Sequence, residues 1–203
     1  MAAASSTPEI GVFLTFQNKP SASFQRQMRR EVDSLLAPAG LRLRWVDKAS
    51  DQPAQFLDTV WVELRGACRL NWSGQSGRRV SGQVVLGWTL VHEGRVQPES
   101  MVDCDQISGV IAALARDVHN PAMLHRMHTR LAGRVMAHEL MHALLRTPVH
   151  HFGYGEDRPL RPWDLLEPGH LEQHQIVALR QVLARRSEPV LAQDPKPGAV
   201  LTP

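Results

Sequence analysis

Apolar and polar positions follow strand-like patterns in five segments of the first half of the chain. Residues 10–16 are almost wholly apolar, which predicts a strand buried on both faces. In 41–46 and 60–65 apolar residues alternate with polar or charged ones, which predicts two more strands. Segments 84–91 and 101–104 predict a fourth and a fifth strand. We therefore expect a sheet of about five strands.

Helical patterns separate and follow these strands. A helix is predicted to begin at Pro20-Ser21 and to end at Pro38-Ala39-Gly40, because apolar residues between these points recur every three or four positions. A short helix is expected around 107–116, and an amphipathic helix is expected near the end of the domain. Trp163 and Asp164 are predicted to cap and anchor that final helix. This order of elements indicates an α+β fold with a mixed sheet.

The longest predicted helix has clear signals at both ends. Asn120-Pro121 forms an N-cap and first-turn pair, and Thr147-Pro148 stops the helix. Arg126, Arg130 and Arg134 recur at every fourth position on a face that we expect to meet solvent. The second half is apolar nearly all round, so we expect it to be buried. The predicted inward stripe contains Leu124, His128, Leu131, Val135, His138, His142 and Leu145.

Within the buried half of this helix the chain reads His138-Glu139-Leu140-Met141-His142. Helical spacing places both histidines and Glu139 in one narrow arc. Zinc binds neutral imidazole nitrogens, and three protein ligands leave its fourth position to water. Glu139 is then placed to accept a proton from that water as general base. Two histidines that merely pack in a core are the alternative interpretation, which the cost of burying unpaired polar groups disfavours.

The sequence HELMH on such a helix resembles the active-site helix of the zincin metallopeptidases. The run from His138 to His150, with Thr147 inside it, is similar to small, poorly characterised bacterial zincin-like proteins. The resemblance implies a zincin-like fold in which the edge strand beside the zinc pairs with an extended substrate. Segment 84–91 is the candidate for that strand. Gly87 within it would either permit a close backbone approach or mark a bulge.

The chain departs from the metzincin pattern within this group. Leu145 and Pro148 stand where metzincins have a glycine and a third histidine. No methionine follows Met141, so the methionine turn of metzincins is missing as well. The chain is therefore not an ordinary metzincin.

A third metal ligand must come from outside the motif. His150 is predicted, since the turn at Thr147-Pro148 could fold the chain back under the metal, and His151 is its immediate rival. The remaining candidates are Glu167 and Glu172, which would match the thermolysin-like gluzincins, and His170 and His174, whose spacing is more typical of a solvated helix face.

Tyr154, the only tyrosine, lies between two glycines shortly after His150. Its phenol could donate a hydrogen bond to the oxyanion that develops during hydrolysis. Anchoring of the loop is the alternative interpretation. Glu156 and Asp157 could orient a ligand histidine or could be solvated loop charges.

Length and composition are those of one globular domain. The 203 residues, 43% of them hydrophobic, are enough for a single core, which we expect over 9–186. A flexible N-terminus is expected at 1–8 and a disordered tail at 187–203, and 70–83 is expected to be a mobile loop. Cys68 and Cys104 could form a disulfide only if the fold brings them together.

Charge and hydropathy limit the partners. The net charge is +3, and the 20 arginines and three lysines do not form a run, so no nucleic-acid partner is expected. No segment approaches about 18 uninterrupted apolar residues, so no membrane span is expected. The first residues lack a basic and an apolar region, so no signal peptide is visible; the cytoplasm is the default expectation, with export left open.

These observations predict a zinc-dependent hydrolase, a metallopeptidase with a peptide or protein substrate. His138, His142 and His150 are the predicted Zn²⁺ ligands, and Glu139 is the predicted base. The alternative is a zincin-fold binding or regulatory protein without turnover. Hydrolysis of a non-peptide amide would use the same site.

Overall fold

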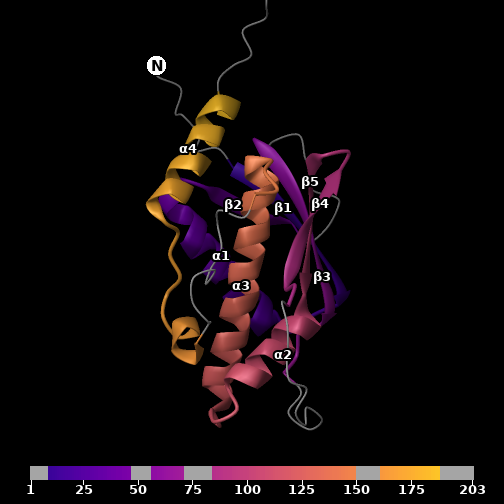
Figure 1. Cartoon of the computed structure of the whole chain (residues 1–203), viewed down its shortest axis with the longest axis vertical. Helices are drawn as coiled ribbons and strands as arrows, with labels where there is room; N and C mark the ends of the chain where they lie inside the picture. Colours follow the sequence, from indigo (N-terminus) through magenta and orange to yellow (C-terminus); the bar gives the residue numbers. More distant parts are fainter. Residues whose placement is uncertain (1–8, 47–55, 71–83, 150–160, 188–203) are drawn as a thin grey trace, which may run out of the picture.

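The computed structural model describes residues 9–46, 56–70, 84–149 and 161–187. This part of the chain contains five strands and four α-helices (Figure 1). In chain order they are β1 (Glu9–Asn18), α1 (Ala22–Leu36), β2 (Arg42–Val46), β3 (Asp58–Ala67), β4 (Gly87–His92), β5 (Arg95–Asp103), α2 (Cys104–Leu114), α3 (Pro121–Leu145) and α4 (Gln173–Ser187).

The strands form one mixed sheet in the order β2-β1-β3-β5-β4. Strands β2, β1, β3 and β5 run parallel to one another, and β4 pairs antiparallel with β5 at the end of the sheet. The predicted five-stranded mixed sheet is thus confirmed. Because the sheet is mostly parallel and α1 connects the parallel strands β1 and β2, the architecture is mixed α/β.

The hairpin between β4 and β5 was predicted incompletely. Strand β5 begins at Arg95, whereas the sequence indicated a strand only from Met101. The charged residues at its start and Pro98 obscure the apolar pattern there. The turn itself, Glu93-Gly94, has positive φ at both residues, as tight two-residue hairpins require.

The core lies between the sheet and the helices. Alternate residues of β1 and β3 point into it, and Ile10, Val12, Val60, Val62 and Leu64 are all almost completely buried. Figure 1 shows α3 running lengthwise past the sheet, and the side view shows α1 beside it. On the outer face of the sheet, Phe13 stacks on Trp61, whose surface is 41% exposed (ring centroids 5.5 Å apart).

The expectation that Arg134 faces solvent was wrong. Arg134 is 5% exposed, and its Nε lies 3.0 Å from Oε1 of Glu31 on α1. Arg130 is half-buried and lies 3.5 Å from the other oxygen of Glu31, while Arg126 is exposed as predicted. The cause is the close approach of the two helices: a Cβ at Gly133 would come within 2.9 Å of the backbone oxygen of Met28 on α1.

Arg134 also holds the segment that precedes the last helix. Its guanidinium donates to the carbonyl oxygens of Asp164 (2.7 Å) and Glu167. The carboxylate of Asp164 accepts from the backbone N–H of Arg161 and so caps a short 3-10 turn, Pro162–Leu165. The prediction that Trp163 and Asp164 cap the final helix was therefore wrong, because α4 begins only at Gln173.

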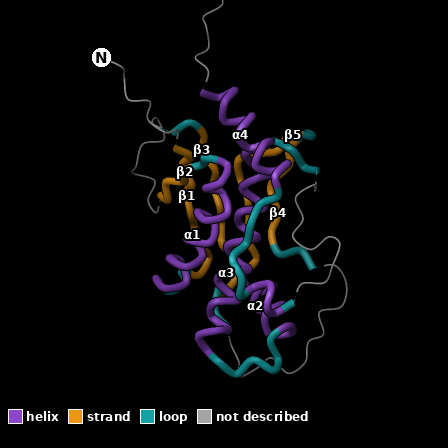
Figure 2. The backbone as a smooth tube through the Cα atoms, turned by 90° about the vertical axis from the view of Figure 1, so that its left-hand side faces the viewer, coloured by secondary structure: helices purple, strands orange, loops and turns teal. Residues whose placement is uncertain are grey.

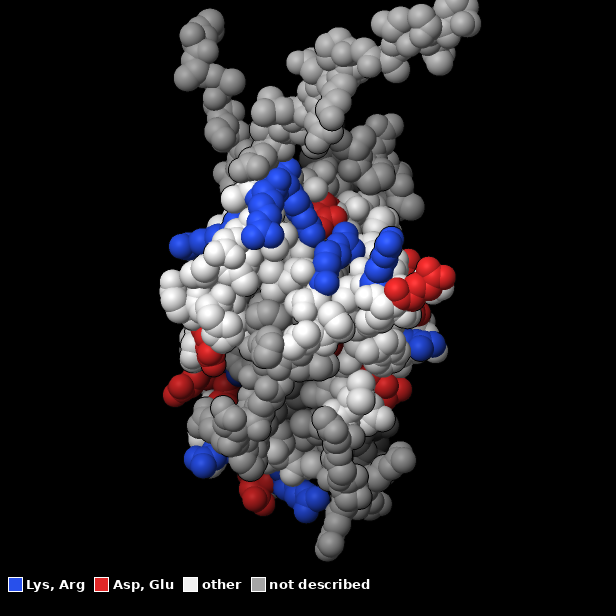
Figure 3. Space-filling model, turned by 45° about the horizontal axis from the view of Figure 1, so that its top comes forward, with Lys and Arg blue, Asp and Glu red and all other residues white. Residues whose placement is uncertain are grey.

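Asp58 joins the ends of three elements. Its carboxylate, at the start of β3, pairs with Arg146 just after α3 and with Arg186 near the end of α4. Arg186 also donates to the carbonyl oxygen of Leu144 in the last turn of α3 (2.7 Å). Figure 3 shows several basic side chains, in blue, gathered at this end of the molecule. Among the described helices, none combines the length and the apolar character needed to cross a membrane.

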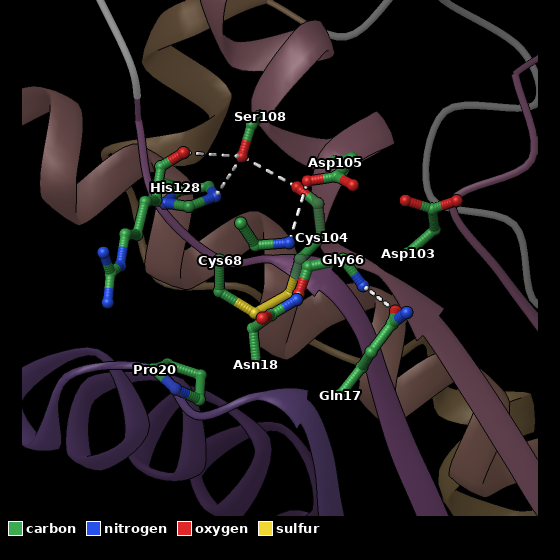
Figure 4. The surroundings of a disulfide bond; sticks show 12 residues. Gln17, Asn18, Pro20, Gly66, Cys68, Asp103, Cys104, Asp105, Ser108 and His128 are labelled. Atoms are coloured by element: carbon green, nitrogen blue, oxygen red, sulfur yellow. Dashed lines mark hydrogen bonds between the residues drawn. A yellow bond between two sulfur atoms is a disulfide. The ribbon is translucent and has the colours of Figure 1, made fainter.

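A disulfide joins Cys68, just after β3, to Cys104, the first residue of α2 (Figure 4). Both cysteines are buried. Next to it the buried Ser108 donates to the carbonyl oxygen of Cys104 and lies 3.1 Å from Nε2 of His128. Burial lowers the pKa of His128 to about 4, so this histidine stays neutral inside the core at ordinary pH. The fold therefore brings together the two cysteines that the sequence left unassigned.

We predict that reduction of this disulfide destabilises the protein. The bond spans a sequence separation of 36, and closing a loop of that size stabilises a fold by about 4 kcal/mol through the entropy of the unfolded chain. Urea unfolding of oxidised and reduced protein should show a loss of that order. A Cys68→Ala/Cys104→Ala variant serves as control, because its midpoint should not respond to reductant. Equal midpoints for the oxidised and reduced parent would contradict the prediction.

Candidate metal centre

The motif His138-Glu139-Leu140-Met141-His142 (HExxH) lies in the last three turns of α3, where the helix packs against the edge strand β4. The helix begins as predicted, with Asn120 accepting from the backbone N–H groups of Ala122 and Met123. It ends at Leu145, and Arg146 follows in the left-handed conformation with φ 53°. These end points match the expected boundaries, and the motif residues are buried or half-buried. Of the apolar residues of this half, Val135 and Leu145 are half-buried, and the others are buried: Met136, Ala137, Leu140, Met141, Ala143 and Leu144.

The two motif histidines face each other. Nε2 of His138 and Nε2 of His142 are 3.0 Å apart, and the rings are close to perpendicular. On the other side of its ring, His142 Nδ1 lies 2.8 Å from the carbonyl oxygen of Thr147. A carbonyl oxygen only accepts, so Nδ1 carries the hydrogen and Nε2 of His142 has a lone pair directed at His138. A proton on His138 Nε2 can satisfy this lone pair, and so can a metal ion.

This arrangement fits a zinc ion. Two nitrogens each about 2.1 Å from a tetrahedral zinc lie about 3.4 Å apart, within a few tenths of an ångström of the separation between His138 and His142. Ligand histidines usually donate their second ring N–H to a carbonyl or carboxylate, as His142 does to Thr147. The turn after α3 places the carbonyl oxygen of Thr147 beside the ring of His142, whereas the predicted return of His150 to the metal concerns a residue outside the described ranges.

Glu139 is held between the helix and the sheet. It is 4% exposed, and its Oε2 accepts a hydrogen bond of 2.7 Å from the Thr89 hydroxyl on β4. Burial raises the pKa of the Glu139 carboxyl to about 7, and the hydrogen bond from Thr89 offsets part of that rise. A carboxyl that titrates near neutral pH can both take and return a proton, which is the property that a general base needs.

The edge strand β4 packs closely against α3 near Val135 and Glu139. A Cβ at Gly87 would come within 2.8 Å of Val135 and 3.1 Å of Glu139, so the glycine permits a close approach and does not mark the bulge, which lies between Thr89 and Val91. Among the described strands, β4 has a neighbour on one side only. Its residues Leu90 and Val91 are 37% and 49% exposed. Within the described part of the chain the outer edge of β4 has no pairing strand, and an uncharged, apolar edge of this kind permits pairing by another extended chain.

The predicted third ligand lies outside the described residues. Neither His150 nor its rival His151 is described, and the same is true of Tyr154, the predicted hydrogen-bond donor to the oxyanion. Within the described ranges, no group of three or more metal-ligating side chains occurs. His138 and His142 are the two members of the predicted set that the structure describes, and it brings them together.

The alternative ligands occupy exposed positions near the final helix. Glu167 and Glu172 are exposed, and Glu172 lies 3.2 Å from the ring of His174. His170 precedes α4, whereas His174 lies within it, so these two histidines do not share a helix face as was expected. Glu156 and Asp157 lie outside the described residues.

Sequence reasoning missed Thr89 and Ser100. Both are hydroxyl residues of the β4–β5 hairpin, and their oxygens are 3.0 Å apart beside Glu139. The alternation in β4 places Thr89 on the same face as Gly87, and this was a usable signal. The pairing of β4 with β5 that brings Ser100 alongside has no counterpart in local sequence.

The chain has no match among models of known protein families. Curated proteins give no match either. Function is therefore inferred from the described residues.

We predict that Gly87→Ala loosens the contact between β4 and α3. The added methyl group would overlap Val135 and the backbone oxygen of Met101, which overpacks the interface and costs about 1–3 kcal/mol. Gly109→Ala on α2 is the matched control, since a Cβ there meets no atom within 4 Å and alanine favours a helix. Chemical denaturation should show a loss of stability for Gly87→Ala and none for Gly109→Ala. Equal stability of the two variants would contradict the close approach.

Proposed function

We propose that this chain is a zinc-dependent hydrolase, and most simply a peptidase, with a zincin-like fold. His138 and His142 would hold the metal together with a third ligand, for which His150 is the candidate. The observation that carries the proposal is the pair of facing Nε2 atoms, one of which belongs to a ring fixed in its tautomer by the Thr147 carbonyl. Two histidines that served only to fill a core would not need this orientation.

The residues around the pair have the chemistry that hydrolysis requires. A zinc ion bound there would act as a Lewis acid and bring the pKa of its water near 7. Glu139 follows His138 directly, and its pKa of about 7 suits a group that accepts the proton of the attacking water and returns it to the leaving group. The low exposure of Glu139 keeps bulk water away from this transfer.

The edge strand supports a peptide as the substrate. Strand β4 lies beside Glu139 and, among the described strands, has a neighbour on one side only, so an extended peptide could add to the sheet there through main-chain hydrogen bonds. The exposed side chains of Leu90 and Val91 would favour apolar contacts. An edge strand beside the zinc that pairs with an extended substrate is also what the resemblance to zincins implies. A binding protein that holds zinc without turnover is the second candidate, and the same assay separates the two.

We expect Glu139→Gln to bind zinc like the parent but to lose most of its hydrolysis. Glutamine keeps the size of the side chain but cannot take up a proton as a carboxylate does, and loss of a general base costs about 10²–10⁴ in rate. Elemental analysis would measure zinc per chain, and an unbiased library of quenched peptides would measure cleavage. Parent-like cleavage by Glu139→Gln would remove Glu139 from the mechanism. Zinc binding without cleavage by the parent would favour the binding protein.

We expect His150→Ala to weaken zinc binding far more than His151→Ala. Neighbouring side chains outside a helix point in different directions, so only one of the two should reach a metal held by His138 and His142. Loss of a ligand leaves two histidines, which is too few for a tight site. Zinc titration of both variants, with Glu172→Ala alongside, measures the effect. Tight binding by His150→Ala and weak binding by Glu172→Ala would identify a gluzincin-like site instead.

A further inference from the structure

One residue of the edge strand contacts Glu139 through its side chain at hydrogen-bond distance. The hydroxyl of Thr89 lies 2.7 Å from Oε2 of Glu139, 3.1 Å from the backbone oxygen of the same residue and 3.0 Å from the hydroxyl of Ser100. We propose that Thr89 is a positioning residue: its hydroxyl holds the Glu139 carboxylate in the orientation that the general base requires. This inference rests on the proposed function of the site.

The direction of the hydrogen bonds follows from the available atoms. A hydroxyl has one hydrogen to donate, and an ionised carboxylate only accepts. Of the two acceptors on Glu139, the ionised carboxylate oxygen at 2.7 Å is closer than the backbone oxygen at 3.1 Å, so Thr89 donates to the carboxylate and its own oxygen can accept from Ser100. Ser100 is 2% exposed and sits on β5, directly paired with Thr89 in the sheet. With Ser100 as the donor to Thr89, the Thr89 hydrogen stays available for the carboxylate.

Burial gives this contact its importance. Glu139 is 4% exposed, so water has little access to replace the hydrogen bond if Thr89 is removed. A glutamate side chain has several rotatable bonds, and a base must lie within hydrogen-bond reach of the proton that it takes. A hydrogen bond from a strand residue fixes one carboxylate oxygen, and the other oxygen can then accept the proton of the attacking water.

The contact also connects substrate binding to the base. Thr89 belongs to β4, the strand that a peptide would extend, and Gly87 two residues earlier keeps that strand against Glu139 and Val135. Any movement of β4 when a peptide pairs with it would therefore move the partner of the base. Thr89 couples the position of the peptide backbone to the position of the carboxylate.

The first test compares three variants of the zinc-loaded chain on the peptide that the parent cleaves fastest in a quenched-peptide library. Thr89→Val keeps the shape of the side chain but removes the hydroxyl, and kcat should fall about tenfold with KM and zinc content unchanged. Thr89→Ser restores the hydroxyl and should return kcat to within about threefold of the parent. Thr15→Val, the same change on an exposed position of β1, should leave kcat as it is.

Three outcomes of this test would overturn the proposal. A parent-like kcat for Thr89→Val would show that the hydroxyl is not needed. A loss in Thr89→Ser as large as that in Thr89→Val would assign the effect to packing by the methyl group. A Thr89→Val variant that loses zinc or raises KM with kcat unchanged would also contradict a role through Glu139.

The second test needs no activity and so separates this inference from the proposed function. Melting temperatures of the zinc-free parent, Thr89→Val, Glu139→Leu and the double variant form a thermodynamic cycle. Thr89→Val should lower Tm by about 2–4 °C, and the double variant should melt higher than additive losses would require. Additive losses would overturn the Thr89–Glu139 hydrogen bond even if the parent cleaves peptides. A coupled cycle in a chain without hydrolysis would leave the contact in place and reject the hydrolase instead.

Discussion

The close packing of α3 against its two neighbours is the constraint on which the candidate site depends. On one side Gly87 lets the edge strand β4 lie directly on the helix, and on the other Gly133 lets α1 approach to backbone contact. Both glycines stand where a single methyl group would collide with a neighbour. The helix is therefore held firmly between strand and helix, and the directions of His138, Glu139 and His142 follow from that position. A looser helix would leave the same residues in place along the sequence without a defined geometry between them.

The two buried glutamates, Glu31 and Glu139, differ in how their negative charge is compensated. Glu31 lies between the guanidinium groups of Arg134 and Arg130, so its negative charge is compensated within the protein. Glu139 is equally buried, but its described side-chain contact is a hydroxyl, and its pKa rises to about 7. The ion pairs of Glu31 with Arg134 and Arg130 link α1 to α3, and Arg134 also holds the segment that includes Asp164. The Glu139 carboxyl can bind or release a proton near neutral pH. Burial of such a group lowers stability, but its pKa suits proton transfer.

The sequence predicted the elements whose signals are local. The N-cap at Asn120, the apolar run of β1 and the motif spacing on α3 each depend on residues a few positions apart, and each was confirmed. Errors arose where a distant segment overrides the local pattern. Arg134 follows Arg130 at helical spacing and was expected in solvent, yet Glu31 from α1 draws it into the interior. Strand β5 carries Pro98 and charged residues, and its partner strands make it a strand all the same.

The candidate site divides in the same way. The sequence by itself determined that His138, Glu139 and His142 share one face of a buried helix, because a helix fixes side-chain direction from spacing alone. Only the tertiary structure decided that His142 donates to the carbonyl oxygen of Thr147, that Thr89 and Ser100 stand beside Glu139, and that Cys68 bonds to Cys104. These contacts join residues through turns and sheet register, where direction depends on how the whole chain packs. Residue spacing along the chain does not determine this packing. The residues that contact the motif could therefore be identified only from the tertiary structure.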